Sequence, residues 1–570
     1  MAEVILILAL AVLLAWPLGH YLARVLNGEP SRADVAFSPI ESMVYGLLRV
    51  DPQQGMTWRG YALAFLLSNA VLGVFAWLVF MFQHLLPLNP DNVPGMRWDL
   101  ALHTAISFLT NTNQQHYSGQ AQLSYLSQMV GIVSLQVLTP MMGLGIAAAM
   151  LRGLFGGRNA ATANEGDARD LGNYWVDVTR LILRVFLPLS LIVALALTMQ
   201  GVPGTFSGAK TVRPLDASAG MSEQTIPVGP VAAMVATKQL GTNGGGWYGP
   251  NSAVPLENPT PLSNAIETVS IVLIPLAVVF MLGPFTGRRR LTALVFGVMA
   301  TLSVVSIGTA VYSEQQPNAA VTGLAAPGPN LEGKEVRFGA SASALWATLT
   351  TQTSNGSVNA MHDSLNPLAG TVTLVNMLIN AIWGGVGCGL VGFLVFLLLS
   401  IFIAGLMIGR TPEVFGRKLE TTEVRLLSFL IVLQSLTILG FTALALVIPD
   451  VAGNSNPGLH GISQVFYEYT SAYANNGSGF EGLSDATYWW NLSASAALLL
   501  GRYPCLVIPL MVAGSLARKR QAPQTAGSLT IESVTFGATI VAVILLITVL
   551  SYLPALVLGT VGEQLMLAGS

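Results

Sequence analysis

Ten apolar runs dominate this chain of 570 residues, and each is long enough to cross a lipid bilayer. A membrane-spanning helix needs about 20 mostly apolar residues. Because lipid offers no hydrogen-bond partners, only helices and closed barrels can span it, and runs of this length indicate helices. The runs begin near Glu3, Tyr61, Leu123, Tyr174, Ser263, Leu291, Thr371, Val424, Trp490 and Ile531. The sequence therefore predicts an all-α integral membrane protein with ten transmembrane helices.

The composition agrees with this class and excludes others. The chain is 52% hydrophobic and only 9% charged, which is too apolar for an ordinary globular protein. Its net charge is -2, and no basic patch with interleaved aromatic residues is present, so we expect no nucleic-acid partner. The two cysteines, Cys388 and Cys505, lie inside apolar runs, which excludes a disulfide framework.

Four uncharged clusters of Thr, Ser, Asn and Gly lie between pairs of these runs. Each follows a shorter, semi-apolar segment that is too brief to span a membrane. One Asn-Gly cluster alone would indicate a turn, but four in the same context indicate a repeat. We therefore predict four units of helix, half-helix, extended loop and helix. The half-helices are expected at 98–109, 230–240, 340–349 and 461–470, and the clusters at 110–115, 241–246, 353–357 and 474–478.

The repeat predicts how the chain is divided. The expected units are an N-terminal helix at 1–26, repeats at 61–151, 174–285, 291–410 and 424–516, and a C-terminal helix at 531–556. Of the 26 Lys and Arg residues, 19 fall on the side of the membrane opposite the clusters. Since positive residues mark the cytoplasmic side, both termini and all four clusters are expected to face outward.

Aligned by sequence, the clusters share a small hydroxyl or amide residue, then Asn, then a residue that is Gly in three copies, then a small or amide residue. Gly at the third position suits a backbone with positive φ or a close approach to a bound species. In this alignment Gln114 takes the glycine position of the first repeat. The four columns are Thr112, Thr242, Ser354 and Asn475; Asn113, Asn243, Asn355 and Asn476; Gln114, Gly244, Gly356 and Gly477; and Gln115, Gly245, Ser357 and Ser478.

These sixteen residues form the predicted cation filter. A half-helix that ends inside the membrane points its partially negative C-terminal carbonyls at whatever lies beyond it. Loops of small residues can then turn main-chain oxygens inward and replace the hydration shell of an ion. The clusters contain no Asp or Glu, although Mg²⁺ and Ca²⁺ sites recruit carboxylates. The pattern therefore favours a weakly hydrated monovalent cation.

Two features are expected to form a gate or barrier on the ion path. The seventh apolar run is interrupted by a group of glycines, Gly384, Gly385, Gly387 and Gly389. Such a break inside a bilayer is tolerated only where protein or water satisfies the freed backbone groups. Arg502, inside the ninth run, should face protein or water, because charge at a helix centre is costly. It either repels cations below the filter or pairs structurally with a Glu or a carbonyl.

The whole chain resembles a known family, the potassium-binding subunits (KdpA) of bacterial Kdp potassium-transporting ATPases. The resemblance rests on residues 110–119 (TNTNQQHYSG), 240–260 (LGTNGGGWYGPNSAVPLENPT), 359–364 (NAMHDS), 402–413 (FIAGLMIGRTPE) and 475–478 (NNGS). It implies a fold of the Trk/Ktr/HKT-like superfamily, with four membrane-pore-membrane repeats and re-entrant half-helices around a central filter, plus one extra helix at each end. The chain departs from the family at Gln114, where familiar members carry an aromatic residue.

The resemblance also implies function, location and partners. It implies a subunit that binds extracytoplasmic K⁺ as the transported ion and passes it to the P-type ATPase subunit, KdpB, in the bacterial cytoplasmic (inner) membrane. The other implied partners are KdpC and a small KdpF peptide. This sequence has no Walker-type phosphate loop and no Asp-Lys-Thr-Gly-Thr, so we expect no ATP site on it. Energy must then come from a partner or from a gradient.

Two other functional classes remain open from the residues. The same filter could serve a passive or gradient-driven K⁺ channel or transporter of the Trk/Ktr type. A secondary transporter of a small polar solute would instead have inverted repeats, whereas all four clusters lie on one side. The six histidines show no metal-ligand spacing along the chain. Glu468, in the fourth half-helix segment, could tune the outer field or satisfy a nearby amide.

Overall fold

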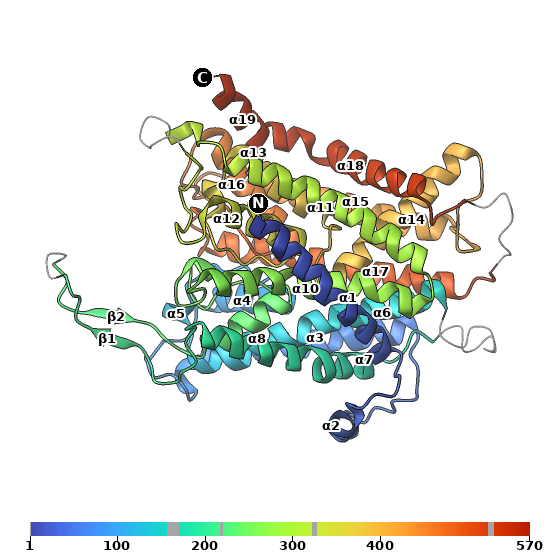
Figure 1. Ribbon diagram of the computed structural model, residues 1–570, viewed down its shortest axis with the longest axis horizontal. Helices are drawn as coiled ribbons and strands as arrows, with labels where there is room; N and C mark the ends of the chain where they lie inside the picture. The colour runs from blue at the N-terminus through green and yellow to red at the C-terminus, as the bar shows by residue number, and fades with distance from the viewer. Residues whose placement is uncertain (1, 157–169, 217–219, 322–327, 522–528, 570) are drawn as a thin grey trace.

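The computed structural model describes residues 2–156, 170–216, 220–321, 328–521 and 529–569. Within these residues, ten helices are long and apolar enough to cross a membrane, which confirms the predicted number. They run side by side along the molecule (Figure 1). The long helices are α1 (Ala2–Leu26), α3 (Trp58–Phe82), α6 (Ser134–Phe155), α7 (Tyr174–Leu181) continued by α8 (Leu187–Met199), α10 (Pro261–Thr286), α11 (Arg289–Glu314), α14 (Cys388–Ile408), α15 (Thr421–Val447), α17 (Tyr488–Ala517) and α18 (Val534–Val557).

Four shorter helices precede the four clusters. They have 12, 10, 14 and 16 residues, which correspond to about 15–24 Å at 1.5 Å per residue. The hydrocarbon core of a bilayer is about 30 Å thick, so each can enter it but not cross it. The expected order of long helix, half-helix, loop and long helix is found four times. The first long helix of each stretch is α3, α8, α11 or α15. The half-helices are α4 (Trp98–Leu109), α9 (Val231–Leu240), α12 (Gly339–Gln352) and α16 (Gly458–Tyr473).

The seventh apolar run is broken, as its glycines predict. It consists of α13 (Pro367–Ile379) and α14, with a segment at 380–387 between them. Asn380 ends α13 in the left-handed conformation, at φ 46°. Inside the break, the Gly384 amide donates to the carbonyl of Gln352 at the end of α12, at 2.8 Å. Protein groups thus satisfy part of the backbone that the break frees from the helix.

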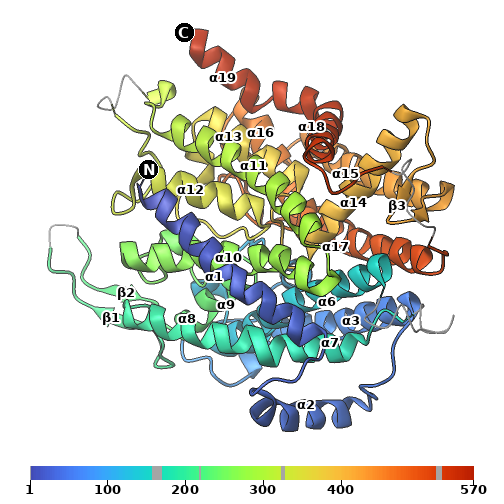
Figure 2. The same cartoon turned by 45° about the vertical axis from the view of Figure 1, so that its right-hand side comes forward.

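The remaining elements lie at the ends and on one flank of the bundle. A hairpin of two antiparallel strands projects from one end, toward which both termini also lie (Figures 1 and 2). Helix α2 lies on the flank, apart from the long helices (Figure 2). Two of the cations used to predict orientation, Arg158 and Arg169, lie outside the described residues. The elements are α2 (Asp34–Leu48), α5 (Gly119–Gln122), β1 (Lys210–Val212), β2 (Gln224–Ile226), β3 (Glu413–Val414), β4 (Arg417–Lys418) and α19 (Thr560–Gly569).

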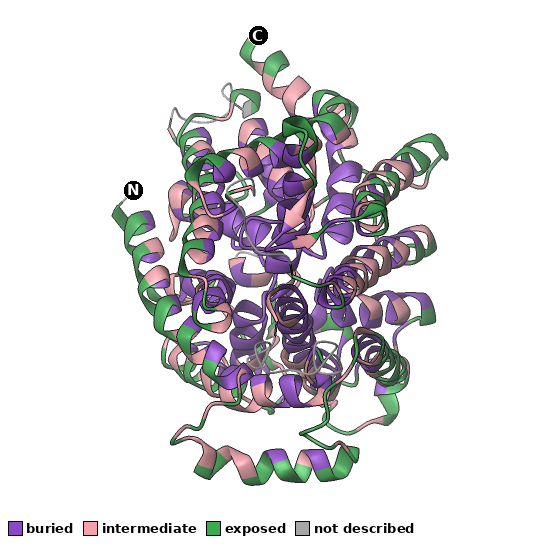
Figure 3. Ribbon diagram, turned by 90° about the vertical axis from the view of Figure 1, so that its right-hand side faces the viewer, coloured by how far each residue is buried: buried purple, intermediate pink, exposed green. Residues whose placement is uncertain are grey.

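Burial separates central helices from peripheral ones. In the most apolar window of α10, 83% of residues are buried, against 28% in α3 and in α15. Buried residues fill the middle of the bundle, and exposed ones line its perimeter (Figure 3). The exposed perimeter is itself apolar, with Leu67 on α3 and Leu546 on α18 more than half exposed. Such faces suit contact with lipid tails, and the protein is an integral membrane protein with an all-α architecture.

A buried ion pair joins four helices near the end of the bundle opposite the clusters. Arg152 on α6 donates to both carboxylate oxygens of Asp177 on α7, at 2.6 and 2.9 Å. The Tyr61 hydroxyl on α3 donates to the same carboxylate at 3.0 Å. Arg152 also donates to the carbonyl of Leu26 at the end of α1, at 3.1 Å. Removing the guanidinium would leave a buried carboxylate without its counter-charge.

We expect Arg152→Met to destabilise the fold by about 3–5 kcal/mol, because the Asp177 carboxylate is then buried unpaired. The double variant Arg152→Met with Asp177→Leu should be clearly more stable than the single one, because no lone charge remains. Thermal unfolding of the detergent-solubilised protein, followed by size-exclusion chromatography, measures both. Equal losses in the single and double variants would contradict this account.

Candidate functional site

The four loops behind the half-helices repeat one backbone conformation. In each loop the residue after the helix cap is left-handed although it is not glycine. The residue two positions later also has positive φ. Left-handed non-glycine residues are strained and cluster at functional sites. The first set is Asn111, Thr242, Ser354 and Asn475 (φ 65°, 48°, 51° and 52°), and the second is Asn113, Gly244, Gly356 and Gly477 (φ 57°, 74°, 85° and 103°).

This conformation corrects the sequence alignment of the first repeat by one residue. The glycine position is taken by Asn113 and not by Gln114, which the sequence alignment put there. Asn tolerates the left-handed region, so it can stand in for glycine. A shared hydrogen bond fixes the same register, because one amide in each loop donates to the carbonyl five residues earlier. These pairs are Thr112 to Ser107, Asn243 to Lys238, Asn355 to Thr350 and Asn476 to Ser471, at 3.0, 3.0, 3.0 and 2.9 Å.

Glycine packing shows that the four loops form a closed ring. A Cβ at any of the three ring glycines would clash with a main-chain oxygen of the next loop. The distances would be 1.9 Å from Gly244 to Asn355, 1.9 Å from Gly356 to Asn476 and 2.1 Å from Gly477 to Thr112. The first and second loops meet where the Asn113 side-chain amide donates to the Gly244 carbonyl at 2.9 Å. All four predicted clusters are therefore brought together at one place.

Four equivalent carbonyl oxygens in this ring have no hydrogen-bond partner among the described residues. They belong to Thr112, Asn243, Asn355 and Asn476, all fully buried or nearly so. Most buried carbonyls in proteins are paired, and four unpaired ones at equivalent positions need a common cause. Main-chain oxygens arranged in this way can serve as ligands of a bound cation.

Side chains of the loops fasten each loop to its neighbours. The Asn355 amide donates to the Lys238 carbonyl at 3.1 Å, and the Asn476 amide donates to the Thr350 carbonyl at 2.8 Å. Each ties a loop to the end of the preceding half-helix. In the first repeat Asn111 takes a similar role, since its amide donates to the Thr242 carbonyl at 2.9 Å. Asn111 was not among the predicted filter residues, and Gln115, which was, lies one step outside the shared four-residue pattern.

A buried cluster of charged and polar groups supports the second loop from behind. Lys238, near the end of α9, is fully buried and forms an ion pair with Glu257. Its ammonium also donates to the Ser252 hydroxyl at 2.9 Å. Glu267 accepts from Ser252 at 2.8 Å and from Gln239 at 2.8 Å. The ion pair of Lys238 with Glu257 and the hydrogen bonds to Ser252 and Gln239 thus brace the end of α9, from which the second loop begins.

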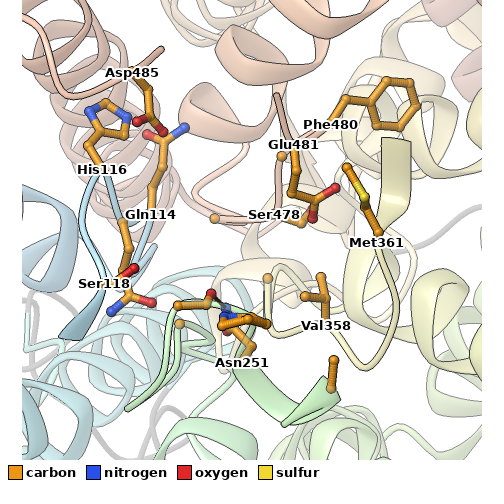
Figure 4. Close-up of a pocket in the computed structure, with 18 of the residues that line it drawn as sticks. Gln114, His116, Ser118, Asn251, Val358, Met361, Ser478, Phe480, Glu481 and Asp485 are labelled. Atoms are coloured by element: carbon orange, nitrogen blue, oxygen red, sulfur yellow. Dashed lines mark hydrogen bonds between the residues drawn. The ribbon is translucent and has the colours of Figure 1, made fainter. Parts of the chain in front are cut away.

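An outer cavity of about 870 Å³ opens above the ring (Figure 4). It is lined by ring residues such as Gly356 and Gly477 and by acidic residues that follow the fourth loop. Burial raises the pKa of Glu481 to about 8 and that of Asp485 to about 6. Glu468 accepts a hydrogen bond from the Gln114 side chain, which agrees with one of the two roles expected for it, that of satisfying a nearby amide. Acidic groups in this mouth suit the entry of a cation.

A smaller cavity of about 100 Å³ lies on the other side of the ring. It is lined by Ser354, Asn475, Gly385 and Arg502. The Thr242 hydroxyl accepts from the Val386 amide at 3.0 Å, so the glycine segment lies directly against the ring.

Arg502 has no acidic partner within ion-pair distance among the described residues. Arg502 is 4% exposed, and its guanidinium donates to the Thr139 carbonyl at 3.0 Å and to the Cys388 sulfur at 2.9 Å. The carbonyl pairing expected for it is present, yet the positive charge stays uncompensated beside the cavity. Both interpretations of Arg502 are therefore compatible with its surroundings.

Comparisons with known proteins agree with this architecture. The family described as "Potassium-transporting ATPase A subunit" (KdpA) matches residues 5–565. A relative from Gloeobacter violaceus, named potassium-transporting ATPase potassium-binding subunit, is 46% identical over 98% of this chain and 97% of its own length. One of the same name from Pseudomonas aeruginosa is 44% identical over 99% of each. The fold is similar to the crystal structure of the potassium transporter TrkH from Vibrio parahaemolyticus, with a TM-score of 0.52 and 14% identity, covering 89% of this chain and 97% of that one.

Neighbouring glycines in the break between α13 and α14 should differ sharply when changed to alanine. A Cβ on Gly387, which has φ 78°, would lie 2.5 Å from the Leu144 Cα, so Gly387→Ala should cost at least about 1–3 kcal/mol of stability. A Cβ on Gly385 would meet its nearest atoms at 3.6 Å, an ordinary contact, so Gly385→Ala should fold normally. Yield and thermal unfolding in detergent compare the two. Equal stability of both variants would argue against the described path of this segment.

Proposed function

Because this chain belongs to the KdpA family of potassium-transporting ATPase A subunits, we propose that it binds K⁺ for an ATP-driven uptake complex and that the ring of loops is its filter. The observation that carries this proposal is the set of four buried, unpaired carbonyls at equivalent positions of the ring. A partly dehydrated K⁺ ion satisfies such oxygens without a fixed negative charge that would trap it. The C-terminal ends of the four half-helices add partial negative charge at the same place.

The filter in this proposal includes Asn111 together with the residues expected from the sequence. Asn111 to Gln114 form its first quarter, and Gln115 supports the adjoining wall by accepting from the Gly246 amide at 2.8 Å. The other quarters are 242–245, 354–357 and 475–478. Repeats at 61–151, 174–285, 291–410 and 424–516 supply these quarters, while the first and last long helices lie outside the repeats.

We place the outer cavity on the extracytoplasmic side of a bacterial inner membrane. The excess of Lys and Arg at the opposite end supports this orientation, which also puts both termini outside. K⁺ enters through the acidic mouth and loses water in the ring. It then reaches the small cavity, where the glycine segment and the uncompensated charge of Arg502 form a barrier to simple leakage.

ATP hydrolysis is assigned to a partner in this proposal. The chain carries no Asp-Lys-Thr-Gly-Thr and no phosphate-binding loop. The partners proposed from the family are the P-type ATPase subunit KdpB together with KdpC and KdpF. Uptake into vesicles with and without ATP, using membranes that contain the whole complex, tests this division. Uptake that proceeds equally without ATP would favour a passive or gradient-driven transporter.

Gly244→Ala should raise the K⁺ concentration for half-maximal ATPase activity of the complex by about tenfold or more, equivalent to about 1.4 kcal/mol. The added methyl group would lie 1.9 Å from the Asn355 carbonyl and must displace one of the four unpaired oxygens. Gly440→Ala is the matched control, because a Cβ there meets nothing within 4 Å. An unchanged K⁺ requirement in Gly244→Ala, with folding intact, would refute the filter assignment.

The K⁺ affinity should rise with pH between about 7 and 9. Glu481, whose pKa is raised to about 8, is neutral at the lower end of this range and negative at the upper end. An added negative charge in the mouth stabilises a nearby cation by about 1 kcal/mol, which is about fivefold in affinity. Glu481→Gln should flatten this rise, and Glu223→Gln, an exposed change outside the cavity, should not. An identical pH profile in Glu481→Gln would exclude this role.

A further inference from the structure

Three side chains that are far apart in the sequence meet at the wall of the outer cavity. His116, Glu468 and Asp485 each offer one ligand atom, and these atoms lie within 4.8 Å of one another. All three residues line the cavity. His116 and Glu468 are 2% and 5% exposed. The side chains of His116 and Asp485 face each other beside Gln114 (Figure 4).

A chain of hydrogen bonds fixes the tautomer of His116. The carboxylate of Asp99 can only accept hydrogen bonds, so the NH₂ group of the Asn491 side chain must be the donor to it, at 2.8 Å. This turns the carbonyl oxygen of the Asn491 side chain toward His116 Nδ1, which is 2.8 Å away and must donate. Neutral His116 then carries its lone pair on Nε2. Metal-binding histidines are oriented in this way, by a hydrogen bond from the ring nitrogen that does not bind the metal.

The lone pair of His116 faces another acceptor. Nε2 lies 3.4 Å from Oε1 of Glu468. Two acceptors at this separation repel each other unless they share a cation, which is either a second proton on His116 or a metal ion. Ligand atoms about 2.0–2.2 Å from a tetrahedral Zn²⁺ lie about 3.4 Å apart, so this pair already has the spacing of two zinc ligands.

Unpaired polar atoms next to the three ligands also indicate a missing partner. Gln114 is 3% exposed, and its Oε1 has no hydrogen-bond partner among the described residues. The same holds for both ring nitrogens of His103, whose ring stacks on that of His116 with centroids 3.8 Å apart. Buried polar groups without partners are costly, and they concentrate here around the three ligand atoms.

We propose that His116, Glu468 and Asp485 form a binding site for a divalent transition-metal ion such as Zn²⁺ at the mouth of the cavity. One imidazole and two carboxylates suit Zn²⁺, while Mg²⁺ and Ca²⁺ prefer oxygen ligands alone. Water completes the coordination. The site is distinct from the ring, because its ligands are side chains and not main-chain oxygens.

A metal ion here would oppose the entry of K⁺, a consequence that rests on the proposed function. It would place two positive charges on the entry route. It would also engage Glu468, the carboxylate that accepts from Gln114 at the edge of the ring. Extracellular Zn²⁺ should therefore act as an antagonist of K⁺ uptake, with the strongest effect at low K⁺ concentration.

Zn²⁺ binding to the purified complex tests the site without reference to transport. Isothermal titration with ZnCl₂, in a buffer that does not chelate metals, should give a site that His116→Gln and Asp485→Asn each weaken by about tenfold or more. X-ray absorption should show a shell of nitrogen and oxygen with no sulfur. His84→Gln is the matched control, because His84 is exposed and does not line the cavity. Two independent variants keep the test valid if one of them fails to fold.

The possible results separate this inference from the proposed function. Equal Zn²⁺ binding in the wild type, His116→Gln and Asp485→Asn would overturn the metal site and leave a shared proton as the cation between His116 and Glu468. Zn²⁺ binding that both variants abolish, in a complex that K⁺ does not stimulate, would support the site and refute the proposed function. Inhibition of K⁺ uptake by Zn²⁺ that is lost in both variants but kept in His84→Gln would support both.

Discussion

Main-chain oxygens left without hydrogen bonds are the constraint on which the rest of this structure depends. Four loops can present such oxygens at one place only if their backbones approach closely. This requires glycine, or Asn113 in its place, where a Cβ would otherwise meet the carbonyl of the next loop. The left-handed residue after each helix cap turns the chain abruptly out of the helix. The strain at these positions is tolerated because the surrounding helices hold every loop from several sides.

Half-helices, side-chain amides and buried charges together support the ring. Half-helices set the direction of each loop, and side-chain amides such as those of Asn355 and Asn476 tie one loop to the half-helix before it. Buried charged residues lie next to these amides, and among them Lys238 and Glu257 form an ion pair. Charge is thus abundant in the protein around the ring but absent from the clusters themselves. If the ring is the proposed filter, its lack of fixed charge lets it release the ion, while the surrounding charges keep its shape.

Much of this arrangement could be predicted from the sequence, because its signals are local. Apolar length predicts the membrane helices, the short segments predict the half-helices, and the glycines at 384–389 predict the break. The register of the first loop was wrong by one residue, because Asn113 adopts a glycine-like conformation that its residue type does not reveal. Asn111, which the proposed filter includes, was left out of the predicted set because its left-handed conformation is equally hidden in the sequence. The meeting of His116, Glu468 and Asp485 could not be predicted, since their proximity comes from the packing of different repeats and no spacing along the chain encodes it.

The segment between α13 and α14 is the barrier in the proposed ion path, and its backbone limits how fast that barrier can open. The backbone at Gly384 packs directly against the backbone at Gly389, so closely that no side chain fits between the two residues. A swinging side chain can open a pore in picoseconds to nanoseconds, but this segment has no side chain to swing at those positions. Any opening has to displace the backbone together with the helix that follows, and such collective motions take microseconds to milliseconds. The proposed barrier is therefore expected to open on the timescale of helix movement and not on that of side-chain rotation.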